Sequence, residues 1–303
     1  MTAPVFDRAF EPHYGTSIRL SPGIRRVVAR NPSAFTFHGT GTYIVGEGTV
    51  AVIDPGPDDP AHLKSLMAAL DGETVSAILI THTHRDHSPL AGPLKDLTDA
   101  PTYGFGPHAA GEDVEEGGDR DFVPDQVLTD GDRVSGPDWT LEAVHTPGHT
   151  SNHLCFAFAE EDALFSGDHV MGWSTSIVSP PDGDMAAYIA SLRKLLTRSE
   201  DLYYPTHGNP ISDAKRHVES FIAHRRDREI QILTCIARRI DRVADMVPAM
   251  YRDVPEHLHP AAARSVLAHL IHMTSEGRIL CDTPEPTLRS RYSLRPERTG
   301  LQI

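Results

Sequence analysis

Apolar and polar positions alternate in short blocks over the first two thirds of the chain. Residues 42–45 and 50–53 are mostly apolar and flank Gly46-Glu47-Gly48, a pattern typical of a β-hairpin. Residues 75–80 form a continuous apolar run, which predicts a strand buried on both faces. Further strands are predicted at residues 140–144, 154–158, 163–165 and 202–204, and helices at 61–70 and 185–196. Strands mixed with helices in two similar halves predict stacked α/β layers.

The pattern changes near residue 212. Residues 213–240 are nearly free of Gly and Pro and carry apolar residues at helical spacing, which predicts one long helix. A second helix is predicted at about residues 261–274. Two strand-like runs, residues 278–281 and 291–294, then surround a Pro-rich turn. Helix, helix and two-stranded ribbon is the order of a winged helix.

Charge also divides the chain near this point. Residues 215–303 hold 15 Lys and Arg against 11 Asp and Glu, a net charge of +4. The first 214 residues hold 13 against 31, a net charge of −18, and the two parts sum to −14. An acidic body with a mildly basic tail indicates two units with different roles. We therefore predict two domains, residues 1–211 and residues 212–303.

The composition is that of a globular protein. Of the 303 residues, 39% are apolar and 23% are charged, which excludes a disordered chain. The first 15 residues lack the apolar core of a secretory signal, and no apolar run approaches the roughly 20 residues of a membrane span. Cys155, Cys235 and Cys281 are odd in number and widely scattered, so we expect inert core thiols in a reducing, cytoplasmic setting.

The densest group of metal-binding residue types is Thr81-His82-Thr83-His84-Arg85-Asp86-His87, directly after the predicted strand 75–80. In an extended segment His82 and His84 point to the same side, because side chains alternate with period 2. If the chain then turns into a helix, Asp86 and His87 face a neighbouring position. Imidazole and carboxylate ligands suit Zn, Fe or Mn. Three histidines and one aspartate within six residues favour a metal site over a solvated loop.

Three more candidate ligands each follow a predicted strand. His149 lies in a Pro-Gly-His-Thr turn, Asp168 in Ser-Gly-Asp, and His207 in Thr-His-Gly. Each of them alone is more often a turn residue. Together they recur at the position where open α/β sheets collect functional residues. This recurrence predicts that they join the histidine-rich segment in one site.

In this order, His-x-His-x-Asp-His, Pro-Gly-His-Thr, Ser-Gly-Asp and Thr-His-Gly resemble the motifs of the metallo-β-lactamase superfamily. The resemblance spans roughly residues 35–210 and rests on a specific four-motif string. It implies an α/β fold of four layers, an αββα sandwich of two similar halves with the site at one edge. We expect this sandwich to be followed by the small helical, winged-helix-like domain.

The resemblance also implies a role for each candidate residue. The seven implied ligands are His82, His84 and His149 for a first metal, Asp86, His87 and His207 for a second, and Asp168 as the bridge between them. Asp54, in Ile53-Asp54-Pro55-Gly56, would orient ligands rather than bind a metal. The implied cofactors are two divalent ions, expected to be Zn with Mn or Fe as alternatives. No other cofactor is expected.

The implied chemistry is hydrolysis by a hydroxide held between the two metals. Two ions about 3.5–4 Å apart lower the pKa of a bridging water toward neutrality and polarise a carbonyl or phosphoryl oxygen. Asp86 is expected to accept or relay a proton as well as to bind metal. No Ser or Cys nucleophile is required, and none lies in a nucleophile elbow.

The C-terminal pattern is similar to the winged-helix tail of lactamase-like proteins, as in Ala268-His269-Leu270 and Glu276-Gly277-Arg278. Some members of that group are single-strand-specific endoribonucleases, and others are thioesterases that act on carrier-bound acyl chains. The acidic first domain disfavours a polyanion, because binding one depends on Lys and Arg. Our first hypothesis is therefore hydrolysis of a thioester or other small acyl ester, as a small molecule or on an acyl carrier.

Three alternative functions stay open, and so does assembly of the chain into a homodimer. One is a metal-dependent endoribonuclease on single-stranded RNA, with Arg85 as the cation expected beside the site. Another is a non-catalytic winged-helix protein that binds nucleic acid, which the complete ligand set disfavours. The third is a mononuclear iron dioxygenase, which would use only the first metal position. His153, four residues after His149, is expected behind the ligands or on the surface rather than in a substrate pocket.

Overall fold

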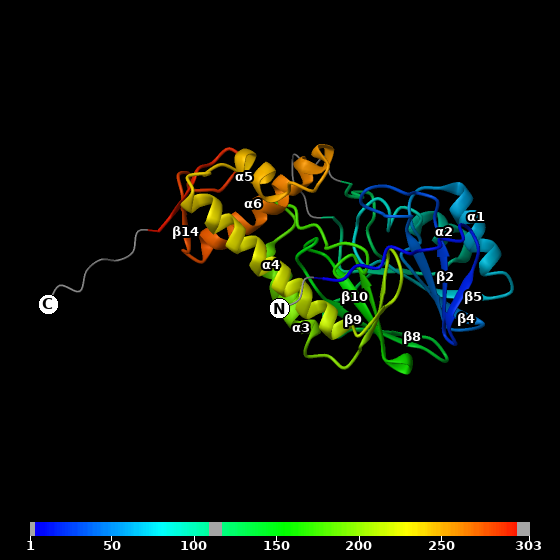
Figure 1. Ribbon diagram of the computed structural model, residues 1–303. Coiled ribbons are helices and arrows are strands. Elements are labelled where there is room, and N and C mark those ends of the chain that lie inside the picture. The colour runs from blue at the N-terminus through cyan, green and yellow to red at the C-terminus, as the bar shows by residue number, and fades with distance from the viewer. Residues whose placement is uncertain (1–3, 109–116, 296–303) are drawn as a thin grey trace.

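The computed structural model describes residues 4–108 and 117–295. Over these residues the chain forms two large β-sheets with helices on their outer faces, and a helical C-terminal unit beside them (Figure 1). Three parts of the predicted domains lie outside the described residues: residues 1–3, 109–116 and 296–303.

The N-terminal sheet combines antiparallel and parallel strands. Its strands are β1 (Ile18–Ser21), β2 (Ile24–Val28), β3 (Gly41–Val45), β4 (Thr49–Ile53), β5 (Thr74–Leu79), β6 (Thr102–Gly104) and β7 (Gln126–Val127). Its helices are α1 (Pro60–Ala69) and α2 (Ala91–Thr98). In the described residues the strands lie in sequence order, antiparallel from β1 to β4 and parallel from β4 to β7. Helix α1 lies in the crossover from β4 to β5, and helix α2 lies in the crossover from β5 to β6.

The second sheet lies against the first. Its strands are β8 (Arg133–Ser135), β9 (Thr140–His145), β10 (Leu154–Phe158), β11 (Ala163–Gly167), β12 (Leu202–Pro205) and β13 (Ile211–Ser212), with η1 (Ala159–Glu161) and α3 (Met185–Leu195) in the connections. Their order in space is β13-β12-β11-β10-β9-β8 over the described residues. Only β11 and β12 pair in parallel among these strands, through a crossover that contains α3.

In the sandwich, buried hydrophobic side chains form three layers, which lie between the four layers of helices and sheets. Alternate residues of β4 point to opposite faces: Ile53 lies between the two sheets, and Val52 lies under the helices. On the outer face of the second sheet, Tyr203 packs in one cluster with Leu192 of α3. The predicted αββα sandwich is therefore confirmed, as is the hairpin formed by β3 and β4.

The C-terminal unit continues from the sandwich through one long helix. Its elements are α4 (Ala214–Ala237), α5 (Val243–Met250), η2 (Glu256–Leu258), α6 (His259–Ser275), β14 (Ile279–Cys281) and β15 (Tyr292–Leu294). The start of α4 packs on the second sheet through Phe221, and its end packs on α6 through Ile232 (Figure 1). Because α4 belongs to both clusters, the domain boundary at residue 212 stays a prediction. The helix-and-ribbon prediction omitted α5, which contains Pro248.

The cysteines differ from one another in burial. Cys155 and Cys235 are buried thiols, as expected, whereas Cys281 is partly exposed, so the expectation of a core thiol is wrong there. Cys281 shares the covered face of the short ribbon with Ile279 and packs at the margin of the C-terminal core, where it is only partly buried. Among the described residues, no helix combines the length and the apolar character needed to cross a membrane.

Candidate metal centre

The side chains predicted as ligands all follow strands that end at one edge of the sandwich. Strands β9, β11 and β12 run in one direction, because β10 is antiparallel to β9 and β11, and β12 is parallel to β11. His149, Asp168 and His207 follow these three strands. In the first sheet, Asp54 follows β4 and residues 82–87 follow its parallel neighbour β5. The two sheets therefore bring all of these residues to the same place.

His82, His84 and His149 form the first group of potential ligands. His82 Nε2 lies 2.9 Å from His84 Nδ1, and His149 Nε2 lies 3.2 Å from the same atom. The donor atoms of the three side chains all lie within 4.8 Å of one another. This spacing suits three nitrogen atoms each about 2.0–2.1 Å from one ion.

Asp86, His87 and His207 form the second group. Asp86 Oδ2 lies 3.3 Å from His87 Nε2 and 3.2 Å from His207 Nε2. Asp86 is held by the Thr40 hydroxyl, which donates to the same carboxylate oxygen at 3.4 Å. These three side chains come from the turn after β5 and from the end of β12, so the second group joins the two sheets.

Asp168 lies between the two groups. Its Oδ2 atom is 3.7 Å from His149 Nε2 in the first group and 3.7 Å from His87 Nε2 in the second. Its Oδ1 atom is 3.4 Å from His207 Nε2. One carboxylate therefore contacts imidazoles of both groups, which is the position that a bridging ligand requires.

Three of the histidines are oriented through their other ring nitrogen. His149 Nδ1–H donates to the Ile177 carbonyl at 2.6 Å, and His207 Nδ1–H donates to the Gly39 carbonyl at 3.1 Å. His87 Nδ1–H donates to Asp54 at 2.9 Å. Since carbonyls and carboxylates only accept, each bond puts a proton on Nδ1 and directs Nε2 toward the centre.

Asp54 is buried and directs its carboxylate away from the centre. It accepts hydrogen bonds from the Thr81 amide at 2.8 Å, the Thr81 hydroxyl at 2.7 Å and the Thr206 hydroxyl at 3.2 Å, in addition to His87. Its backbone is left-handed, with φ of 50°. The side chain thus ties the segment after β5 to the end of β12, which is what an orienting residue must do.

Several donor atoms at the centre are buried without a partner. Among the described residues, His87 Nε2, His207 Nε2 and Asp168 Oδ1 have no hydrogen-bond partner. Leaving such an atom unpaired costs about 1–3 kcal/mol. Nitrogen and carboxylate donors that converge in this way are the set that Zn, Mn and Fe accept. The residues present therefore fit two divalent ions.

The same side chains shift one another's pKa values. Burial acts to raise the pKa of Asp86 and of Asp168, but His87 and His207 outweigh it and hold both values well below the ordinary one. Burial acts to lower the pKa of His207, but the two carboxylates raise it to about 10. In the first group, burial and neighbouring imidazoles lower the pKa of His84 to about 3. Divalent ions thus compete with protons mainly at the second group.

His153 supports the ligands from behind. It is fully buried, and its Nε2 accepts the Asp168 amide proton at 3.2 Å. Its Nδ1 lies 2.9 Å from the Thr146 hydroxyl, and its ring packs on His82 with centroids 5.2 Å apart. This agrees with the expectation of a place behind the ligands. Only the spacing to His149 indicated it in the sequence, and nothing indicated Thr40, since threonine is common in turns.

Arg85 lies beside the ligands but does not face them. It is exposed, and its Nε–H donates to the Gly118 carbonyl at 3.3 Å. Its backbone amide donates to the Gly117 carbonyl at 2.6 Å. The cation expected beside the site is therefore directed toward the loop that contains Gly117 and Gly118.

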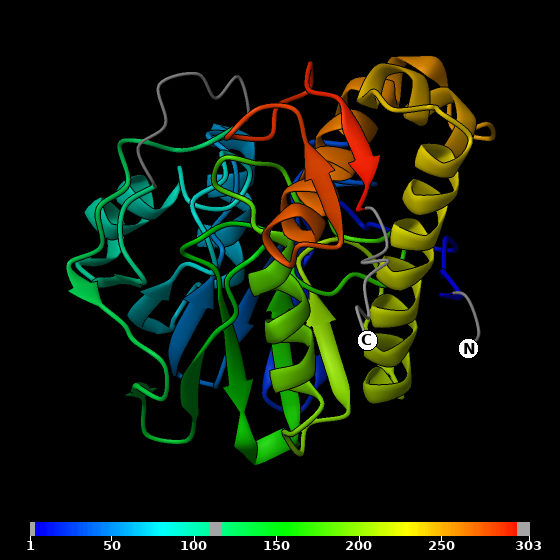
Figure 2. The same ribbon diagram turned by 90° about the vertical axis from the view of Figure 1, so that its left-hand side faces the viewer.

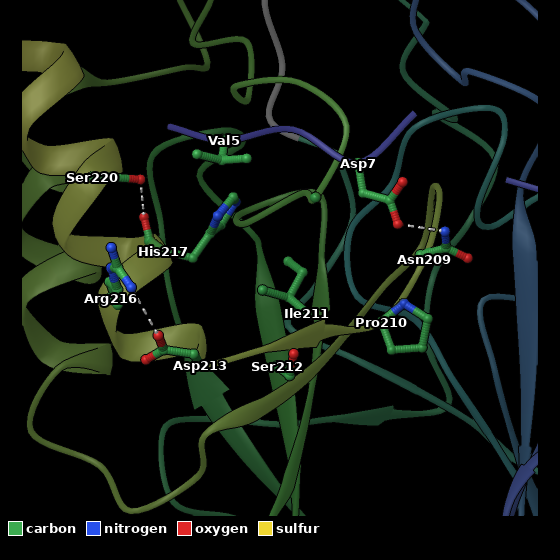
Figure 3. A pocket seen from close by; sticks show the side chains of 11 residues that line it. Val5, Asp7, Asn209, Pro210, Ile211, Ser212, Asp213, Arg216, His217 and Ser220 are labelled. Atoms are coloured by element: carbon green, nitrogen blue, oxygen red, sulfur yellow. Dashed lines mark hydrogen bonds and ion pairs between the residues drawn. The ribbon is translucent and has the colours of Figure 1, made fainter. Parts of the chain in front are cut away.

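Two pockets of the described surface include residues that adjoin the ligand segments: Asn209 follows His207 by two residues, and the Asp184 amide donates to the Gly148 carbonyl at 3.0 Å. No predicted ligand lines either pocket. The first, of about 470 Å³, lies between the N-terminal segment, the β12–β13 turn and the start of α4 (Figure 3). Its polar side chains largely contact one another: Asn209 donates to Asp7 at 2.8 Å, and Arg216 lies 3.8 Å from Asp213. The second, of about 590 Å³, lies between the sandwich and the C-terminal unit.

Comparison with known proteins identifies the family of the chain. Residues 36–207 match the metallo-β-lactamase superfamily, and residues 243–283 match the β-lactamase associated winged helix domain. A β-lactamase-like protein 2 homolog from Drosophila melanogaster is 33% identical over 276 residues, which cover 86% of this chain and 91% of that protein. An atrochrysone carboxyl ACP thioesterase from Claviceps purpurea is 33% identical over 242 residues, 77% of this chain and 73% of the relative.

Solved structures share the whole fold. A β-lactamase domain protein from Burkholderia ambifaria superimposes with a TM-score of 0.76 at 22% identity, covering 96% of this chain and 97% of its own. At this identity the likeness concerns the fold alone. Because the superfamily match covers more than half of the chain and the winged-helix match follows it, the chain belongs to the metallo-β-lactamase superfamily of hydrolases and carries its associated winged-helix domain.

Proposed function

We propose that this protein is a dinuclear metal hydrolase of thioesters or related small acyl esters. The observation that carries the proposal is the convergence of seven donor side chains in two groups with a shared carboxylate. The proposed ligands are His82, His84 and His149 for one ion, Asp86, His87 and His207 for the other, and Asp168 for both. Zinc is the proposed metal, because nitrogen-rich sets with a carboxylate suit it.

The chemistry would be divided between the ions and the chain. Two bound divalent ions would polarise the substrate carbonyl and make water acidic enough to react near neutral pH. Asp86 is the more accessible of the two carboxylates, with 25% of its side chain exposed against 10% for Asp168. We propose that Asp86 takes a proton from the attacking water and returns it to the leaving sulfur or oxygen. Asp54, Thr40 and His153 would keep the ligands in place during this step.

The choice of a thioester rests on a relative and on charge. The relative from Claviceps purpurea is a thioesterase of an acyl carrier protein by name, and the alignment covers most of both chains. The first 214 residues have a net charge of −18, which disfavours a polyanionic substrate. We therefore place an acyl group, free or on a carrier, ahead of RNA.

A substrate panel tests the proposal. Zinc- and manganese-loaded protein should be assayed with acyl thioesters, lactones, bis-p-nitrophenyl phosphate and single-stranded RNA. We expect thioesters to be hydrolysed fastest, and we expect a chelator to remove the activity. Cleavage of RNA without any thioester hydrolysis would replace the proposal with the endoribonuclease hypothesis.

A further inference from the structure

The pocket of about 590 Å³ has two walls from different parts of the chain. One wall is the loop before α3, with Pro180 and Pro181. The other comes from the C-terminal unit, with Leu267 and Ile271 of α6 and Leu288 of the β14–β15 loop. Figure 2 shows this loop extending from the C-terminal ribbon toward the loops of the sandwich. We call this space the interdomain pocket.

The walls of the interdomain pocket are fixed by hydrogen bonds. Arg264 of α6 donates to the Pro180 carbonyl at 3.2 Å, which joins one wall to the other. In the β14–β15 loop, the Thr287 amide donates to Ser290 Oγ at 3.0 Å, and the Tyr292 hydroxyl donates to the Thr287 carbonyl at 3.0 Å. A pocket with walls held in this way loses little freedom when a ligand binds.

The same loop before α3 also holds the turn that carries His149. The Ile177 carbonyl accepts from His149 Nδ1 at 2.6 Å, and the Asp184 amide donates to the Gly148 carbonyl at 3.0 Å. The Ser151 amide donates to Asp182 Oδ1 at 3.2 Å. A single segment therefore contacts the first metal group through Ile177 and lines the interdomain pocket a few residues later.

The lining favours an apolar chain. Leu288 is a large apolar side chain that stays 41% exposed at the pocket, and Pro180, Pro181 and Ile271 add apolar surface. Arg289 is the one Lys or Arg of the described chain that lines this pocket, so a row of cations for phosphates is not built there. The volume lies in the range of small-molecule sites, and such sites are mostly apolar.

We propose that the interdomain pocket binds the apolar chain of the acyl group whose carbonyl is hydrolysed at the metal centre. This inference rests on the proposed function, because the chain enters the pocket only if an acyl substrate occupies the centre. The winged-helix unit would then select substrates by chain length rather than bind nucleic acid. A longer chain would gain affinity by burying methylene groups between Ile271 and Leu288.

The test is a chain-length series of N-acetylcysteamine thioesters from butanoyl to decanoyl. Each methylene group that is fully buried raises the affinity about fourfold, and each one that is half buried raises it about twofold. For the full-length, metal-loaded protein we expect kcat/KM to rise about tenfold or more from butanoyl to decanoyl. We expect Leu288→Asn to lower the decanoyl-to-butanoyl ratio about fivefold, because it replaces apolar surface with an amide. Ile271→Trp should lower the same ratio by filling the pocket.

Leu294→Asn is the matched control. Leu294 is 44% exposed on the same ribbon but does not line the pocket, so its substitution should leave the ratio unchanged. An unchanged ratio in both Leu288→Asn and Ile271→Trp would overturn the inference while leaving thioester hydrolysis in place. So would hydrolysis with no preference for chain length.

A binding measurement separates this inference from the proposed function. Calorimetry with decanoate and butanoate does not need turnover. If no thioester is hydrolysed, yet decanoate binds at least about tenfold more tightly than butanoate and Leu288→Asn removes the difference, the proposed function is wrong and the apolar pocket stands. If the two acids bind equally and no thioester is hydrolysed, both ideas are wrong.

Discussion

Histidines and carboxylates form two clusters in this molecule, and the two clusters differ in how the charge of the carboxylates is balanced. The first is the candidate metal centre. The second, which we call the α4–α6 cluster, consists of Glu229, His269, His272 and Arg278. Arg278 Nη1 lies 2.6 Å from Glu229 Oε2, and His272 Nδ1 lies 3.3 Å from Glu229 Oε1. A buried carboxylate is thus compensated by a guanidinium of the same chain.

At the candidate metal centre, no Lys or Arg pairs with the carboxylates within the described ion pairs. Within the described ion pairs, Asp86 and Asp168 pair there only with imidazoles. We infer from this contrast that the α4–α6 cluster is structural, because the chain supplies its own guanidinium cation. At the candidate centre the donors converge without Lys or Arg, which favours a metal ion as the missing cation.

The largest expected effect is loss of activity in the metal centre. Asp86→Asn keeps the size of the side chain but removes its ability to take a proton, so hydrolysis should fall about 10²–10⁴-fold. His84→Ala removes a first-group ligand and should lower metal content as well as turnover. Steady-state kinetics with elemental analysis measures both effects, and circular dichroism should show an unchanged fold. Wild-type rates in Asp86→Asn on every substrate would rule out its role in proton transfer.

Asp54→Asn should have the next largest effect. The amide cannot accept all the hydrogen bonds from Thr81, Thr206 and His87, so His87 loses its fixed orientation. Removing such a partner lowers metal affinity about 10- to 100-fold. Competition with a chromogenic chelator measures the affinity. Unchanged affinity would show that Asp54 supports the fold rather than the ligands.

The α4–α6 cluster should respond in the opposite way. Glu229→Gln leaves Arg278 and His272 without their shared carboxylate, and we expect the free energy of unfolding to fall by about 1–3 kcal/mol. Metal content should stay unchanged. Glu276→Gln is the control, because Glu276 also contacts Arg278 but is far more exposed than Glu229. This substitution should lower the free energy of unfolding by about 0.5 kcal/mol or less. Loss of metal in Glu229→Gln would erase the distinction between the two regions.

The smallest expected effect is a pH dependence in the same cluster. The hydrogen bond with Glu229 raises the pKa of His272 above its ordinary value, against the effect of burial. A raised pKa stabilises the fold fully below about pH 6.5, and this contribution disappears as the pH rises through the folded-state value. His272→Gln should therefore destabilise more at pH 6 than at pH 9, by about 0.5 kcal/mol. Urea unfolding at the two pH values measures the difference, and an equal cost would contradict it.

Much of the sandwich could be predicted from sequence because its strands are buried on both faces. Strands β3, β4 and β5 consist mostly of buried apolar residues, so they are visible in the sequence as short apolar runs. Strand β2 was missed because Arg25 and Arg26 interrupt it, although Arg26 is buried and donates to the Gly208 carbonyl. Tertiary contacts outweigh local preference there. Helix α2 was missed because Gly92 and Pro93 are typical turn residues, although they lie in its first turn, where proline removes no helical hydrogen bond.

The candidate site was more predictable than the residues that support it. The histidines and aspartates occur in dense motifs at strand ends, so their types and spacing indicate one centre. Thr40 carries no such signal, because its role depends on loops that meet only in the folded protein. The interdomain pocket is harder still to predict from the sequence, because the residues of its two walls are about a hundred positions apart in the chain.

Metal stoichiometry tests the central claim most directly. After anaerobic loading with zinc, manganese or iron and removal of free metal, elemental analysis should give close to two equivalents per chain for the wild type. His84→Ala should give fewer, while Glu229→Gln should match the wild type. Saturation at one iron per chain would contradict the dinuclear centre and favour the mononuclear dioxygenase, and retention of no metal would remove the basis of the account.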